Sequence, residues 1–199
     1  MSIAKKIGGA ILIAFGLFPF FGFPAPEGLS FLTDLSVRII FIAIGLTFLG
    51  FGFFFTKRNV AAIIMFLLAN GMLIPVPLQW RIILFIYSLD LISIPFLSIP
   101  FFDIGKILGR IFLIIFLFFL SAFHATSLLK VDIGFAIMLV IILTVGEILA
   151  SIFLPLGNLI SALIKAGIVF FAALFILGGF SLQLAGILAF GILLLNLIL

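Results

Sequence analysis

The chain has 199 residues, of which 67% are hydrophobic and 8% are charged, and its mean hydropathy is +1.66. A soluble globular domain is about half apolar and about one-quarter charged. This chain therefore has too few polar side chains to cover a water-facing surface. The composition excludes a soluble globular domain, a nucleic-acid-binding domain and a disordered segment. The net charge of +4 is typical of a membrane protein in which Lys and Arg residues collect on the cytoplasmic side.

The composition also limits the chemistry. The chain contains no cysteine and one histidine, which excludes disulfides and leaves too few ligands for a usual zinc site. It lacks the short motifs of zinc proteases, α/β-hydrolases and P-loop nucleotide-binding proteins. We predict no catalytic residue, no metal and no cofactor, and we expect that the protein is not an enzyme.

Long apolar segments follow one another along the chain. A membrane-spanning helix needs roughly 20 apolar residues, and eight such segments fill most of the sequence. We predict one all-α domain over residues 1–199, a polytopic transmembrane helix bundle with about eight spans and short loops. The predicted spans are residues 7–23, 35–55, 60–78, 82–102, 107–129, 133–154, 159–177 and 182–199.

The distribution of cations predicts the orientation. The proposed cytoplasmic rim holds Lys5, Lys6, Lys57, Arg58, Lys106 and Arg110, and the outer rim holds Arg38, Arg81 and Lys130. This excess favours an N-terminus and a C-terminus that both lie in the cytoplasm, in a protein of the cytoplasmic membrane. The last four cations of the cytoplasmic rim could attract anionic lipids, although topology alone explains them. The first span also resembles a signal peptide, but its length and the lack of a small-residue cleavage motif favour a retained helix.

Prolines interrupt the third and fourth spans. Pro75 and Pro77 follow the third span closely, and Pro95 and Pro100 lie in a tandem Ser-Ile-Pro-Phe sequence within the fourth. Each proline kinks or breaks a helix. Broken helices at membrane depth need partners for the freed backbone groups, and they build many transporter sites. A simple kink is the alternative. A GxxxG motif at 105–109 predicts close helix packing at the start of the fifth span.

Charged side chains inside a membrane are costly, at about 2.5–3.5 kcal/mol each, and therefore need a partner or a function. Glu147 and Lys165 each lie nine residues from residue 156, in the turn between two spans. Nine residues correspond to about 13 Å along a helix, so an antiparallel hairpin brings both side chains to the same depth. We predict an intramembrane pair, which either staples the two helices or gates a proton or ion path.

Several further polar residues lie within predicted spans. Asp90 lies deep in the fourth span, and His124 lies near the outer end of the fifth. They could form a proton path or polar network with Asn70, which lies near the middle of the third span. The alternatives are an interfacial histidine and an amide that bonds a neighbouring helix. Asp34 and Arg38 have the spacing of a helical ion pair, which we expect at the outer rim.

Two functional hypotheses follow. Because polar groups that could line a solute path are scarce, we favour a structural or accessory subunit of a larger membrane complex. Its expected partners are the lipid bilayer and other membrane subunits or a second copy, and no nucleic acid. The alternative is a small ion- or proton-coupled transporter or channel that uses Asp90, Glu147 and Lys165. A dry bundle with paired charges favours the subunit, whereas a cavity that reaches these charges from one side favours transport.

Overall fold

The computed structural model describes residues 3–17, 34–71, 74–94, 98–99, 102–123, 132–175 and 180–199. Eight α-helices dominate these residues. They are α1 (Ile3–Leu17), α2 (Leu35–Leu49), α3 (Lys57–Ala69), α4 (Leu78–Leu91), α5 (Ile104–Phe123), α6 (Ile133–Ile152), α7 (Asn158–Phe175) and α8 (Leu182–Ile198). Two 3₁₀-helices, η3 (Phe51–Phe54) and η4 (Leu154–Leu156), and a two-stranded antiparallel pair, β1 (Ser98–Ile99) and β2 (Phe102–Asp103), complete the set.

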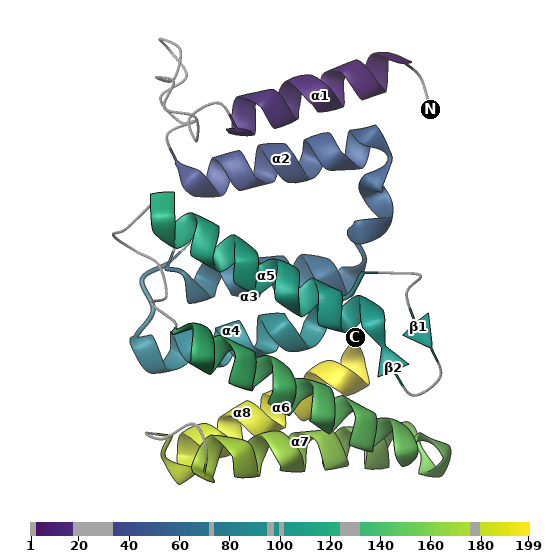
Figure 1. Ribbon diagram of the computed structural model, residues 1–199, viewed down its shortest axis with the longest axis vertical. Coiled ribbons are helices and arrows are strands. Elements are labelled where there is room, and N and C mark those ends of the chain that lie inside the picture. The colour runs from purple at the N-terminus through teal and green to yellow at the C-terminus, as the bar shows by residue number, and fades with distance from the viewer. Residues whose placement is uncertain are drawn as a thin grey trace.

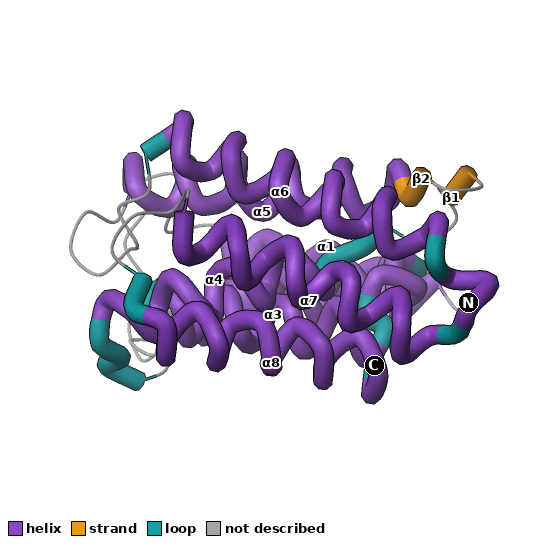
Figure 2. Tube along the Cα trace, turned by 90° about the horizontal axis from the view of Figure 1, so that it is seen from below, coloured by secondary structure: helices purple, strands orange, loops and turns teal. Residues whose placement is uncertain are grey.

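Consecutive helices run in opposite directions, so that the bundle has two ends (Figure 1). Both termini lie at the same end, together with η4 and the β1–β2 pair (Figures 1 and 2). The α1–α2 hairpin packs backbone against backbone, since a Cβ atom at Gly45 would lie 2.6 Å from the carbonyl oxygen of Gly9. The other six helices surround a shared apolar core, to which Phe66, Phe85, Leu117, Leu139 and Leu188 belong.

Two polar segments between predicted spans form the first turns of helices. Residues 57–59 open α3, because the side chain of Thr56 accepts a hydrogen bond from the Asn59 N–H at 3.2 Å and so caps the helix. Residues 79–81 lie in the first turn of α4, directly after Pro77, and proline suits the start of a helix. The polar residues 57–59 and 79–81 therefore lie in the first turns of α3 and α4 and not in loops between helices.

The fourth predicted span is broken and not merely kinked. Helix α4 ends at Leu91, and the following backbone is extended at Ile92. Residues 95–97 and 100–101, which include both prolines of the tandem sequence, lie outside the described residues. The break leaves Asp90 in the last turn of α4, where it is fully buried.

Helices α6 and α7 are long and apolar enough to cross a membrane. Length and composition alone do not separate such helices from the core helices of a soluble protein. In the most apolar stretches of α6 and α7, however, only 28% and 33% of the residues are buried. The outer face of α6 consists of large apolar side chains, among them Ile137, Ile141 and Val145. Most of the apolar surface of these two helices therefore faces outward.

Candidate functional site

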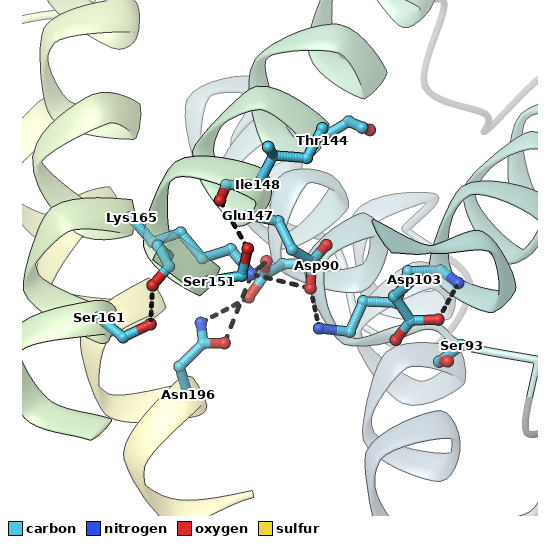
Figure 3. A network of polar contacts seen from close by, with 12 residues as sticks. Asp90, Ser93, Asp103, Thr144, Glu147, Ile148, Ser151, Ser161, Lys165 and Asn196 are labelled. Carbon is cyan, nitrogen blue, oxygen red and sulfur yellow. Dashed lines mark hydrogen bonds and ion pairs between the residues drawn. The ribbon is translucent and has the colours of Figure 1, made fainter. Parts of the chain in front are cut away.

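A cluster of charged side chains lies at the end of the bundle that holds both termini. Five helices contribute to it. Its members are Asp90 of α4, Lys106 and Arg110 of α5, Glu147 of α6, Lys165 of α7 and Asn196 of α8. Figure 3 shows Lys165, Asn196 and Asp90 pointing toward one another, with Glu147 beside them. We call these six residues the charge cluster.

One half of the charge cluster is centred on Asp90. Its carboxylate forms an ion pair with the ammonium group of Lys165. The Asn196 amide donates a hydrogen bond to the other carboxylate oxygen at 2.9 Å, and the Asn196 carbonyl oxygen accepts one from Lys165 at 3.4 Å. Asp90 is 0% exposed and Lys165 is 3% exposed. A buried ion pair needs such additional hydrogen bonds, because the desolvation of both charges is costly.

The other half is centred on Glu147, whose two carboxylate oxygens bind different cations. The first forms an ion pair with Lys106, and the second accepts a hydrogen bond from Arg110 at 2.7 Å. The Arg110 guanidinium also donates to the Thr144 hydroxyl at 2.9 Å and to the Leu89 carbonyl oxygen at 3.0 Å. This planar fork of donors thus joins α5 to both α4 and α6.

Glu147 and Lys165 lie at the same level, 4.0 Å apart between Oε1 and Nζ. Each of them nevertheless has a closer partner, which the sequence does not predict as such. Lys165 pairs with Asp90, and Glu147 pairs with Lys106 and Arg110. The intramembrane pair predicted from the spacing is therefore the junction between two ion-paired groups and not an isolated staple.

The predicted basic rim divides into two parts. Lys106 and Arg110 are buried, and they face Glu147 instead of the surroundings. Their spacing of four residues places both on one face of α5. Lys57 is exposed, whereas Arg58 is half-buried in the first turn of α3. In the structure Lys106 and Arg110 lie near the start of α5 with their side chains turned into the bundle.

The broken backbone after α4 is held from two sides. The Asn59 side chain donates to the Ser93 carbonyl oxygen at 2.8 Å and accepts from the Ser93 N–H at 3.0 Å. These two bonds replace the backbone partners that a continuous helix would supply. On the opposite side lies the predicted GxxxG motif, whose glycines admit this extended segment and not a helix. A Cβ atom at Gly109 would lie 3.2–3.3 Å from Ile92, and one at Gly105 would overlap the Ile94 carbonyl oxygen.

A cavity of about 410 Å³ leads to the charge cluster from the end of the bundle. Its walls include Lys106, Glu147 and Lys165, together with Arg58 and the Asn158 side chain at the start of α7. Leu154 of η4 and Leu199 at the C-terminus line its exposed margin. Arg58 takes part in none of the ion pairs described above, and its Nε atom is buried with no hydrogen-bond partner among the described residues.

A layer of apolar side chains closes the bundle behind the charge cluster. One helical turn farther from the cavity mouth, four of the five helices of the charge cluster carry a buried apolar residue. These residues are Ile86, Leu143, Val169 and Ile192, one turn from Asp90, Glu147, Lys165 and Asn196, respectively. These buried side chains lie between the charge cluster and the other end of the bundle.

The remaining predicted polar residues lie apart from the charge cluster. Asn70 ends α3, is fully buried, and donates to the Phe66 carbonyl oxygen of its own helix at 2.8 Å. Asp34 precedes α2, and its carbonyl oxygen accepts from the Arg38 N–H at 3.1 Å. The Arg38 side chain is buried. His124 lies outside the described residues, so the predicted link between Asp90 and His124 stays a prediction.

Asn196 and Thr144 belong to the polar network, but the sequence reasoning missed them. Asn196 lies in the last turn of α8, where a polar side chain gives a weak signal because it could equally meet headgroups or water. Thr144 contributes one hydroxyl within the apolar helix α6. Neither carboxylate of the charge cluster is arranged to bind a metal, since Asp90 and Glu147 are each paired with cations. Within the part of the chain that the structure describes, no group of three potential metal ligands occurs.

The chain has no match among known protein families. No family model matches it, and neither a curated protein nor a solved structure shows a significant match. Function therefore has to be inferred from the charge cluster and the cavity that leads to it.

Proposed function

We propose that the protein is a small ion- or proton-coupled membrane transporter with eight spans, in which the charge cluster is the central site. The observation that carries the proposal is the cavity of about 410 Å³, which reaches Glu147 and Lys165 from one end of the bundle. An accessory subunit has no need of such access. Transporters bind their substrates and coupling ions near broken helices, and here the break after α4 adjoins Asp90.

The outward-facing apolar surface supports the membrane assignment. A soluble protein rarely exposes an apolar patch larger than a few hundred Å². Large apolar side chains are exposed on all eight helices, with Ile7, Ile40, Ile64, Leu78, Phe112, Ile141, Phe171 and Phe190 as examples. Lipid would cover this surface. Because eight alternating helices place both termini at one end, the cation distribution favours the cytoplasm for that end.

The proposed mechanism depends on the ion pairs of Glu147. While the carboxylate is charged, Lys106 and Arg110 hold it and tie α5 to α6. Protonation of Glu147 from the cavity would release both cations. The apolar layer behind the cluster would then be free to open toward the other side, so that the proton crosses and can carry a substrate with it. Glu147 is the proton acceptor in this proposal, and Lys165 with Asp90 keeps α4 and α7 together.

The lack of cysteine allows a direct test of one-sided access. We expect an Ala162→Cys variant, with its thiol on the cavity wall, to react with a membrane-impermeant maleimide in inverted membrane vesicles and not in right-side-out vesicles. Val169→Cys is the control, because Val169 lies two turns farther along α7 in the apolar layer. It should be protected in both preparations. Equal labelling of the two variants would contradict a closed layer behind the cavity.

Proton flux tests the transport function itself. The assay uses proteoliposomes that carry a potassium diffusion potential and a trapped pH dye. The lumenal pH should change faster in proteoliposomes with the wild-type chain than in empty liposomes. Glu147→Gln should lower this rate to that of empty liposomes, since it removes the proton acceptor. Lys57→Gln, a change outside the cavity, should keep the wild-type rate. A wild-type rate equal to that of empty liposomes, together with a co-purifying partner, would favour the accessory subunit instead.

A further inference from the structure

The cavity carries more positive charge than its carboxylates can balance. Four cations, Arg58, Lys106, Arg110 and Lys165, line the cavity or lie directly behind it. They face two carboxylates, Asp90 and Glu147. A third carboxylate, Asp103, accepts from the Lys106 N–H at 3.2 Å at the start of α5 and does not line the cavity. Counted over these side chains, the charge stays positive even when Asp103 is included.

Among the described residues, Arg58 is the cation of the cavity wall with no acidic partner. The other cations each bind Asp90 or Glu147, whereas Arg58 has no ion pair among those found in the described residues. Its Nε atom is buried and lacks a hydrogen-bond partner there. A buried donor without a partner is unfavourable, and a small movement of Arg58 toward an oxygen acceptor in the cavity that it lines would supply that partner.

The rest of the wall suits an oxygen-rich anion. Ser151 and Ser161 lie on facing sides of the α6–α7 hairpin, and Asn158 lies in the first turn of α7. The Ser161 hydroxyl donates to the Ala150 carbonyl oxygen at 2.7 Å, which fixes this wall. Three of the five α-helices that line the cavity, α3, α5 and α7, have their N-terminal ends at this end of the bundle. Helix N-terminal ends carry a partial positive charge that favours anions.

We propose that this cavity binds a phosphate-bearing anion, with the Arg58 guanidinium as its principal ligand and Lys106 and Lys165 as flanking charges. The planar guanidinium donates two parallel hydrogen bonds to phosphate oxygens, which favours this chemistry over a simple halide. The volume of about 410 Å³ falls in the range of small-ligand sites. The anion is either a free phosphate compound or the headgroup of an anionic lipid. Only its role as a transported substrate rests on the proposed function; its binding does not.

Thermal unfolding of the purified full-length chain in a neutral detergent tests the binding. With inorganic phosphate as the probe, at constant ionic strength against chloride, the midpoint of the circular dichroism transition should rise and saturate. Arg58→Gln should raise the half-saturating phosphate concentration about ten-fold, the effect of losing one charge-assisted contact. Lys57→Gln is the matched control. It removes the same charge from the neighbouring position, where the side chain is exposed and does not line the cavity.

The source of the anion is distinguished by a second arm in lipid nanodiscs. If phosphatidylglycerol raises the unfolding midpoint relative to phosphatidylcholine and weakens the response to free phosphate, the anion is a lipid headgroup. If only free phosphate acts, the anion is a soluble compound. The proposal is overturned if neither probe gives a saturable shift, or if Arg58→Gln and Lys57→Gln weaken the response equally. Phosphate binding without proton flux would reject the transporter and keep the anion site, and flux without binding would do the reverse.

Discussion

Replacing Lys165 by Met should cost the protein about 3–5 kcal/mol of unfolding free energy, because it leaves the fully buried Asp90 carboxylate without its cation. Asp90→Asn combined with Lys165→Met should recover most of this loss, since an amide and a thioether carry no charge that needs a partner. The measurement is reversible unfolding in mixed detergent micelles, followed by circular dichroism, for the wild type and all members of the double-mutant cycle.

A parallel cycle tests which carboxylate is the true partner of Lys165. Glu147→Gln combined with Lys165→Met should recover less, because the two side chains approach only to 4.0 Å and Glu147 keeps two other cations. Equal coupling energies in the two cycles would contradict the division of the charge cluster into two halves. Additive losses for Asp90 and Lys165 would show that they do not interact at all.

Gly105→Ala should destabilise the protein by about 1–3 kcal/mol, the usual cost of forcing an extra carbon into a packed site. A Cβ atom at this position would overlap the Ile94 carbonyl oxygen and lie 3.1 Å from the Ile94 carbonyl carbon. The segment cannot move aside freely, because the Ile94 N–H donates to the Gly105 carbonyl oxygen at 2.9 Å. The change should displace the backbone that follows Asp90, and unfolding in mixed micelles measures its cost.

Gly167→Ala is the matched control for this prediction. Gly167 also lies inside a helix, α7, but a Cβ atom there would meet nothing within 4 Å. The same chemical change should therefore stabilise the protein by about 0.5–1 kcal/mol, the ordinary benefit of alanine over glycine in a helix. If the two variants shift stability in the same direction, the extended segment after α4 does not depend on close approach at Gly105.

The sequence predicted the helical architecture well, because long apolar segments separated by polar, glycine and proline residues are strong signals. Eight helical segments occur where eight were expected, and α6 and α8 begin at their predicted residues, Ile133 and Leu182. The predicted helix starts were less accurate where polar residues lie in the first turn of the helix, as in α3, which begins at Lys57, and α4, which begins at Leu78. Polar residues favour both loops and first turns, so local composition cannot separate the two.

The charge cluster was only partly predictable. Equal distance from a turn correctly indicates that Glu147 and Lys165 share one level, since it depends only on the helical rise. Partner choice depends on helix rotation and on non-consecutive contacts, such as that of α4 with α8, which spacing does not encode. Asp90 was predicted to lie deep within the fourth span, which prolines kink or break. The break after Leu91 places it instead at the end of a short helix, where Lys165 and Asn196 reach it.

The pairing of Asp90 with residues 165 and 196 has a consequence for biogenesis. If the chain is inserted into a bilayer from its N-terminus, as the proposed function requires, α4 emerges long before α7 and α8 have been synthesised. The carboxylate must meanwhile be protonated, face water or be shielded by the insertion machinery. A chain released before its last two helices would keep an acidic group with no counter-charge on α7.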